Sequence, residues 1–195
     1  MRELGLNLFT DHAGYAFASR RALVRTAGGV LVGCFLMSLA AQVKVPVPGT
    51  TVPMTLQSFA VLLVGFALEP SRAAAAMLLY LACGACGLPV FAPGSAGLAG
   101  ETGGYIVGFV LAASVISLVR GRGEAALVRS LQAGTVGLMV LFVCGVGWRA
   151  VWSGGDVRFA VVTGLLPFVV KAVVELLLAL TLVTSVRGLR RRSSP

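Results

Sequence analysis

The sequence is poor in charged residues and has a single histidine. Asp, Glu, Lys and Arg make up only 12% of the 195 residues, 57% are hydrophobic, and the mean hydropathy is +0.94. No soluble domain of this length could bury so much apolar surface, so the soluble classes are excluded and lipid must be the solvent. His12 is the one histidine, and no second C-x-x-C accompanies Cys83–Cys86, which argues against a zinc site.

Catalytic motifs are missing as well. Neither Lys44 nor Lys171 follows a glycine, so the nucleotide-binding pattern G-x-x-x-x-G-K-[ST] cannot be written, and H-E-x-x-H and G-x-S-x-G do not occur. Glu175 is the only carboxylate well inside an apolar span, which excludes the acid pairs of proton pumps. We therefore expect a protein that is not an enzyme, hydrolyses no nucleotide itself and carries no cofactor.

Apolar spans account for most of the chain and predict an all-α, polytopic integral membrane protein, a bundle of six transmembrane helices with both termini in the cytoplasm. A cytoplasmic segment over residues 1–22 precedes the transmembrane domain of residues 23–186, and a basic cytoplasmic tail follows over 187–195. The six helices are expected at Leu23–Val43, Leu56–Leu68, Ala73–Phe91, Gly103–Val119, Leu131–Trp148 and Phe159–Val186.

The orientation follows from the positions of the 16 Lys and Arg residues. With both termini inside, twelve of them fall in inner segments, one lies within the sixth span, and the outer segments hold only Lys44, Arg149 and Arg158. This bias is typical of cytoplasmic loops and predicts a multi-pass protein of the cytoplasmic membrane, in contact with the lipid bilayer. Because the arginines flank apolar spans instead of forming one basic face, we expect no nucleic-acid partner.

Two outer loops are rich in Gly, Pro and Thr and carry almost no charge. They are Val45–Gln57 and Gly87–Tyr105, and both should lie at the outer face, where a small solute would enter. Hydroxyl and amide side chains there can bind a ligand directly, and glycines let the backbone approach one closely. The candidate binding residues of these loops are Thr55, Gln57, Thr102, Gly103 and Tyr105.

A pair of opposite charges lies inside the sixth span. Lys171 costs roughly 3 kcal/mol at a helix centre, and Glu175 follows it by one turn on the same face. The pair is either a neutralised couple facing the bundle interior or a cation for a bound carboxylate that Glu175 orients, and a paired charge in a membrane favours the second interpretation. Pro167 should open the helix just before the pair and free a carbonyl group.

Two aromatic residues and two glycines complete the candidates. Tyr80 lies mid-helix, so its hydroxyl needs a partner from protein or ligand, and Phe91 could stack on an apolar ring or serve packing alone. Gly29 and Gly33 form a G-x-x-x-G in the first helix. That pattern lets two helices approach closely, either inside the bundle or at a docking face for another membrane subunit.

A series of short motifs occurs in order between residues 27 and 119. They are Pro48 with Thr55-Leu56-Gln57, Leu79-Tyr80-Leu81 with Gly84, Gly87-Leu88-Pro89-Val90-Phe91, Gly97-Leu98, and Thr102-Gly103-Gly104-Tyr105 with Gly108-Phe109. Together they resemble the signature of the BioY family, the biotin-binding membrane subunits of energy-coupling factor transporters. The match is dense over these residues and loose over the remainder of the chain.

The resemblance implies a six-helix bundle with a biotin pocket near the outer face, capped by the two loops. It also implies a transmembrane coupling subunit and two cytoplasmic ATPase subunits as partners, with the face of Gly29 and Gly33 as the docking surface for the former. Biotin fits the polar inventory, since it has a carboxylate for Lys171, a ureido group for Gln57 and an apolar bicyclic body for Phe91.

Two positions depart from the family pattern. Glu101 stands where the family typically has proline, and Phe168 stands where the last helix usually has aspartate, three residues before the lysine. If that aspartate normally meets the ureido ring, Glu175 or a backbone carbonyl must replace it. Two alternatives to a biotin subunit remain open: a sister subunit for another small carboxylate vitamin, and a membrane scaffold without a solute.

Overall fold

The computed structural model describes the backbone of residues 3–120 and 126–192 and the side chains of residues 23–120, 127–186 and 188–189. Helices form nearly all of its regular structure, and two short strands pair antiparallel with Lys44 opposite Thr55. In chain order the elements are α1 (Glu3–Gln42), β1 (Lys44–Val45), β2 (Met54–Thr55), α2 (Gln57–Ala67), α3 (Pro70–Ala85), η1 (Gly97–Ala99), α4 (Gly103–Val119), α5 (Ala126–Trp152), α6 (Val157–Gly164), η2 (Leu166–Phe168) and α7 (Val169–Arg192).

The predicted all-α membrane bundle is confirmed. Helix α4 has the predicted bounds, and α2 differs from its prediction by one residue at each end. Among the described residues, three helical stretches are long and apolar enough to cross a membrane, namely Leu23–Gln42, Leu127–Trp152 and Val157–Val186, while α2 and α4 are shorter apolar helices. Together with α3 they make up the six expected helices.

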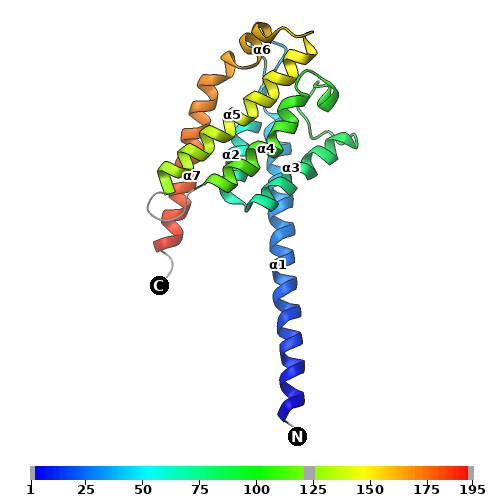
Figure 1. Cartoon of the computed structure of the whole chain (residues 1–195), viewed down its shortest axis with the longest axis vertical. Helices are drawn as coiled ribbons and strands as arrows, with labels where there is room; N and C mark the ends of the chain where they lie inside the picture. The colour runs from blue at the N-terminus through cyan, green and yellow to red at the C-terminus, as the bar shows by residue number, and fades with distance from the viewer. Residues whose placement is uncertain (1–2, 121–125, 193–195) are drawn as a thin grey trace.

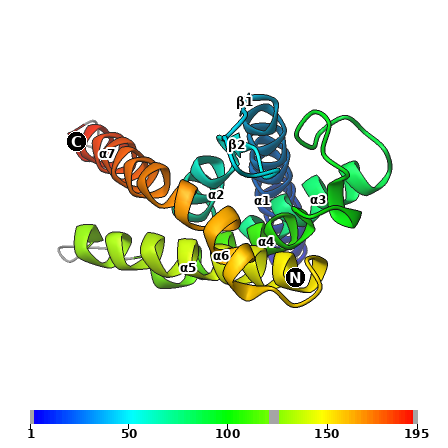
Figure 2. The same ribbon diagram turned by 90° about the horizontal axis from the view of Figure 1, so that it is seen from above.

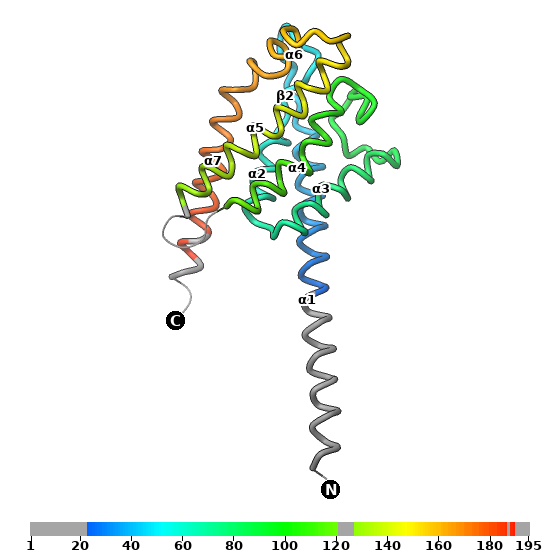
Figure 3. Tube along the Cα trace, in the orientation of Figure 1, coloured from blue at the N-terminus to red at the C-terminus, as the bar shows by residue number. Residues whose placement is uncertain are grey.

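Helices α1 and α7 lead both ends of the chain out of the bundle on the same side, opposite α6 and β2 (Figures 1 and 3). This arrangement agrees with an even number of spans, whereas the side of the membrane on which the termini lie stays a prediction. The same holds for the cytoplasmic segment 1–22 and the basic tail 187–195, because most of their side chains lie outside the described residues.

Helices α2 and α4 lie in the middle of the bundle, with α1 and α3 on one side and α5 and α7 on the other (Figures 2 and 3). Helix α4 packs against α2, α3 and α5, and α7 packs against α2 and α5. Many large apolar side chains point away from this core, among them Leu31 and Phe35 of α1 and Val143 of α5. In a membrane bundle such side chains face lipid.

Helix α3 ends at Ala85, six residues before the predicted end at Phe91. Gly87 has a φ of +86°, in the left-handed region that glycine adopts without strain, and the Leu88 N–H donates to the Cys83 carbonyl over 3.1 Å. This is the usual glycine-based helix stop, which the apolar run from Leu88 onward masked in the sequence. Phe91 therefore lies in the α3–α4 loop and not on a helix.

Gly29 and Gly33 face the interior of the bundle. A Cβ on Gly33 would lie 2.8 Å from the Ala76 Cβ of α3, and a Cβ on Gly29 would lie 3.2 Å from Leu68 Cδ2. The two glycines thus allow α1 to approach its neighbours closely. The G-x-x-x-G serves an internal helix contact, and the docking of a membrane subunit at this face stays a prediction.

Helix α5 continues past its predicted end at Trp148 as far as Trp152, so Arg149 belongs to the helix and not to an outer loop. Its side chain is only 2% exposed. The Arg149 side chain bonds to Thr163 of α6 and to two loop residues that are described below, which explains how a charged residue is accommodated inside the bundle.

Pro167 interrupts the last span, as predicted. The helix breaks into α6, the 3-10 turn η2 and α7, and the Phe168 N–H donates to Leu165 instead of Gly164. The carbonyl of Gly164 is thereby released from the helix. It accepts a 2.6 Å hydrogen bond from the Tyr105 hydroxyl of α4, which ties the broken helix to the centre of the bundle.

Candidate ligand-binding site

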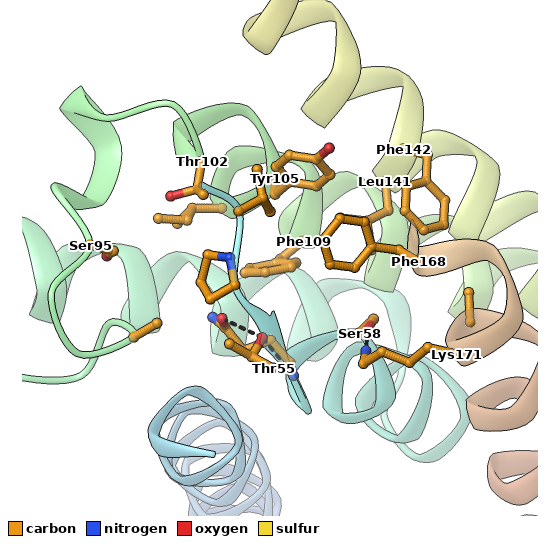
Figure 4. Close-up of a pocket in the computed structure, with 16 residues that line it drawn as sticks. Thr55, Ser58, Ser95, Thr102, Tyr105, Phe109, Leu141, Phe142, Phe168 and Lys171 are labelled. Carbon is orange, nitrogen blue, oxygen red and sulfur yellow. Dashed lines mark hydrogen bonds between the residues drawn. The ribbon is translucent and has the colours of Figure 1, made fainter. Parts of the chain in front are cut away.

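A cavity lies between α2, α4, α5, α7 and the two Gly/Pro-rich loops (Figure 4). Most of its wall is apolar, and a few hydroxyl, amide and ammonium groups reach it from different elements, as is usual for sites that bind small molecules. Its lining residues are Val52, Pro53, Thr55, Gln57, Ser58, Ala92, Ser95, Thr102, Tyr105, Ile106, Phe109, Leu141, Phe142, Phe168, Lys171 and Ala172.

Three phenylalanines line the wall in addition to Tyr105: Phe109 of α4, Phe142 of α5 and Phe168 of η2. In the sequence Phe168 stands out only as a departure from the family pattern, and Phe109 and Phe142 are not among the predicted site residues. Each sits in a helical segment that is apolar almost all round, so its sequence position does not distinguish a cavity-lining ring from a lipid-facing or packing one.

A chain of polar groups lies where the β-hairpin enters α2. The Thr55 hydroxyl donates to Gln57 Oε1 over 2.9 Å, and Gln57 Nε2 donates to the Tyr80 hydroxyl over 2.8 Å. Gln57 and Tyr80 are both buried, at 7% and 0% exposure. Since an amide has two N–H groups and two acceptor lone pairs, these bonds fix the orientation of Gln57 and leave one N–H and one lone pair for a ligand.

The charged pair of α7 forms a closed triangle with a serine of α2. The distance from Lys171 Nζ to Glu175 Oε1 is 2.7 Å, the ammonium donates to Ser58 Oγ over 2.7 Å, and the serine hydroxyl donates to Glu175 Oε2 over 2.7 Å. Lys171 and Ser58 line the cavity, whereas Glu175 lies behind them. The sequence spacing anticipated the pair, but Ser58 was missed because its contact joins residues more than a hundred positions apart.

Five of the predicted site residues reach the cavity wall, namely Thr55, Gln57, Thr102, Tyr105 and Lys171. The others lie one layer further out. Tyr80 supports Gln57, and Phe91 packs edge-to-face on Tyr80 with ring centroids 5.3 Å apart, away from the cavity. Gly103 lies against Leu98 and Trp148, where a Cβ would clash with the Leu98 carbonyl oxygen.

Above the cavity, three side chains connect the two loops to the helices. Glu101 of the α3–α4 loop pairs with the guanidinium of Arg149 and accepts a hydrogen bond from the Thr51 hydroxyl of the β1–β2 loop. The hydrogen bond from Thr51 and the adjacent Arg149 charge lower the pKa of Glu101 against the opposing effect of partial burial. Glu101 and Arg149 each stand out in the sequence, but no pattern in it connects the two residues.

Comparisons with known proteins agree on one family. The model of the BioY family matches residues 12–192. A protein of Pyrococcus horikoshii named "Probable biotin transporter BioY" is 37% identical over 156 residues, which cover 78% of this chain and 90% of that protein. The "Biotin transporter BioY" of Thermotoga maritima is 36% identical over 160 residues, covering 78% of this chain and 94% of that protein.

One solved structure shares the fold. It is a crystal structure of the S-component for biotin from an ECF-type ABC transporter, with a TM-score of 0.73, and the match covers 86% of this chain and 93% of that one. The sequence identity is 19%, so this likeness concerns the fold alone.

Proposed function

This chain belongs to the BioY family, and we propose that it captures biotin as the substrate-specific subunit of an energy-coupling factor transporter in the cytoplasmic membrane. The observation that carries the proposal is the cavity itself. One ammonium group, Lys171, faces an otherwise largely apolar space that aromatic rings and a fixed amide complete.

The chemistry of the wall fits biotin group by group. The carboxylate of biotin binds the Lys171 ammonium, which Ser58 and Glu175 hold in place. The ureido group takes the free N–H and lone pair of Gln57, and the bicyclic body lies against Phe109, Phe142 and Phe168. The apolar role expected of Phe91 therefore passes to these three rings, and Glu175 acts through Lys171 instead of meeting the ligand.

Uptake driven by ATP requires partners, because the chain has no nucleotide-binding motif of its own. A transmembrane coupling subunit and two cytoplasmic ATPase subunits supply the energy, and the chain itself is not an enzyme. With both termini in the cytoplasm, the cavity faces outward, because residues of the β-hairpin and of the α3–α4 loop line it. Biotin then enters from outside and is released inward after the subunit reorients.

The thermal stability of the purified protein in detergent tests the proposal. A ligand at a hundredfold excess over its dissociation constant stabilises the folded state by about 2.7 kcal/mol. We expect a shift with biotin and none with lipoate, loss of the shift in Lys171→Met, and retention of it in Lys44→Met. Lys44 is a matched control because it is a lysine outside the cavity wall.

A shift with another vitamin in place of biotin would mean that Phe168 and Glu101 have changed the ligand, and the chain would be a sister subunit. No shift with any vitamin, in protein shown to be folded, would favour the scaffold alternative. Unchanged biotin affinity in Lys171→Met would refute the role assigned to this lysine.

A further inference from the structure

The cluster above the cavity joins three parts of the chain that are otherwise far apart in sequence. Thr51 belongs to the β1–β2 loop, Glu101 to the α3–α4 loop and Arg149 to the end of α5. One carboxylate oxygen, Glu101 Oε2, takes bonds from both the Thr51 hydroxyl and Arg149 Nη1. The same guanidinium nitrogen also donates to Thr51 Oγ1 over 3.3 Å.

Arg149 is the fixed member of this cluster. Its Nε donates to Thr163 Oγ1 of α6 over 2.8 Å, and its guanidinium carbon lies 5.2 Å from the centroid of the Phe159 ring. The side chain is almost fully buried, whereas that of Glu101 is 31% exposed. The two loops are therefore attached, through Glu101, to a cation that the helices hold in place.

The cluster borders the route by which a ligand would reach the cavity. Its loop members adjoin cavity-lining residues in the sequence, since Thr51 precedes Val52–Pro53 and Glu101 precedes Thr102. A second, outer depression is lined by Thr51, Glu101, Lys44 and neighbouring loop residues. It shares Pro53, Ser95 and Thr102 with the cavity, so these residues lie between the outer depression and the cavity, next to the cluster.

We propose that Thr51, Glu101 and Arg149 form a latch that closes the outer mouth of the cavity and sets the rate at which ligand enters and leaves. The proposal rests on the proposed function for its ligand, whereas the cluster itself rests on contacts within the chain. All three are positioning residues, since none of them needs to touch biotin.

The charges around Glu101 determine which variant tests the latch. Arg149 faces it from α5, Lys44 shares the lining of the outer depression from β1, and Asp156 caps α6, with its carboxylate accepting from the Phe159 N–H over 2.8 Å. Glu101→Gln keeps the size of the side chain and removes its charge. Asp156→Asn makes the same change at the same end of the molecule and preserves a helix cap, which makes it the matched control.

Exchange of radiolabelled biotin measures the latch in the intact protein in nanodiscs. Hydrogen bonds to charged groups contribute about 1.5–3 kcal/mol, so releasing the loops corresponds to about a tenfold or larger change in rate. We expect both the association and the dissociation rate of Glu101→Gln to rise about tenfold, with little change in the dissociation constant. Thr51→Val keeps the ion pair and should raise both rates less, and Asp156→Asn should match the wild type.

Hydrogen–deuterium exchange on the ligand-free protein provides the second measurement. Glu101→Gln should accelerate amide exchange in both loops, residues 46–53 and 88–102, while Asp156→Asn should leave them unchanged. Unchanged amide exchange in the loops of Glu101→Gln would overturn the latch. A rise in the biotin dissociation rate without a rise in the association rate would also overturn it, because loss of a contact in the bound state produces that result. Failure of the wild type to bind biotin would refute the proposed function, and loop exchange would still decide the latch.

Discussion

Removing the two members of the Glu101–Arg149 pair should have unequal effects on stability. Glu101→Ala leaves the guanidinium of Arg149 buried without its carboxylate, and breaking a buried pair in this way costs about 3–5 kcal/mol. Because Glu101 is 31% exposed, water can partly reach the site, so we expect about 3 kcal/mol, the lower limit of that range. Glu101→Ala should lower the free energy of unfolding more than removal of any other single carboxylate in the outer loops.

Arg149→Met should destabilise the protein less. The variant loses the hydrogen bond to Thr163, about 1 kcal/mol, and the contact with the Phe159 ring, about 1 kcal/mol, while the half-buried Glu101 can be solvated. Combining Arg149→Met with Glu101→Ala removes the uncompensated charge, so the double variant should lose only about 2 kcal/mol. The two single losses therefore do not add, and the coupling energy is about 3 kcal/mol.

Reversible unfolding in mixed detergent–SDS micelles gives the three free energies. Additive losses in the double variant would refute the reasoning, because they would show that the pair contributes nothing beyond its separate members. The pH dependence offers an independent check. The pKa of Glu101 is lowered in the folded protein, so the stability it contributes is fully present above its unfolded value of about 4.3 and is lost as pH falls through the folded value. Glu101→Gln should abolish this acid-side loss.

Two further substitutions test the residues that lie behind the cavity wall. Tyr80→Phe removes the acceptor of Gln57 Nε2, and a lost hydrogen bond costs about 1 kcal/mol, so biotin binding should weaken about fivefold to tenfold. Titration calorimetry measures this affinity, and an unchanged value would exclude Gln57 as an oriented contact. Gly84→Ala places a Cβ against the Phe91 ring and should lower the free energy of unfolding by about 1–3 kcal/mol. Gly147 has open space around it, so Gly147→Ala should not lower the free energy of unfolding. Equal thermal midpoints of the two variants would contradict the packing of Phe91.

The parts of the fold that could be predicted from the sequence are those set by local patterns. The bounds of α4 follow from glycines at one end and Arg120 at the other, and the break at Pro167 follows from a missing N–H. The end of α3 and the burial of Arg149 were missed. The first depends on one glycine inside an apolar run, and the second depends on Glu101, which lies 48 residues away in sequence.

The same distinction applies to the candidate site. Residues with an unusual polar character for a membrane span, such as Lys171 and Gln57, could be selected from the sequence because their burial demands partners. The aromatic residues of the wall could not be selected, because an apolar side chain can pack equally well against lipid, another helix or a ligand. Phe91 illustrates the ambiguity: its ring could stack on a ligand or serve packing alone, and it packs on Tyr80 instead of lining the cavity.

The two buried ion pairs have different mechanical roles because of where their partners lie in the chain. Lys171 and Glu175 are one turn apart on α7, so movement of a loop does not separate them, and the pair can keep the ammonium at the cavity wall throughout transport. Arg149 and Glu101 belong to a helix and a loop, so their contact exists only when the loop is closed. The first pair is suited to holding a ligand-binding group in place, and the second to reporting and controlling whether the cavity is open.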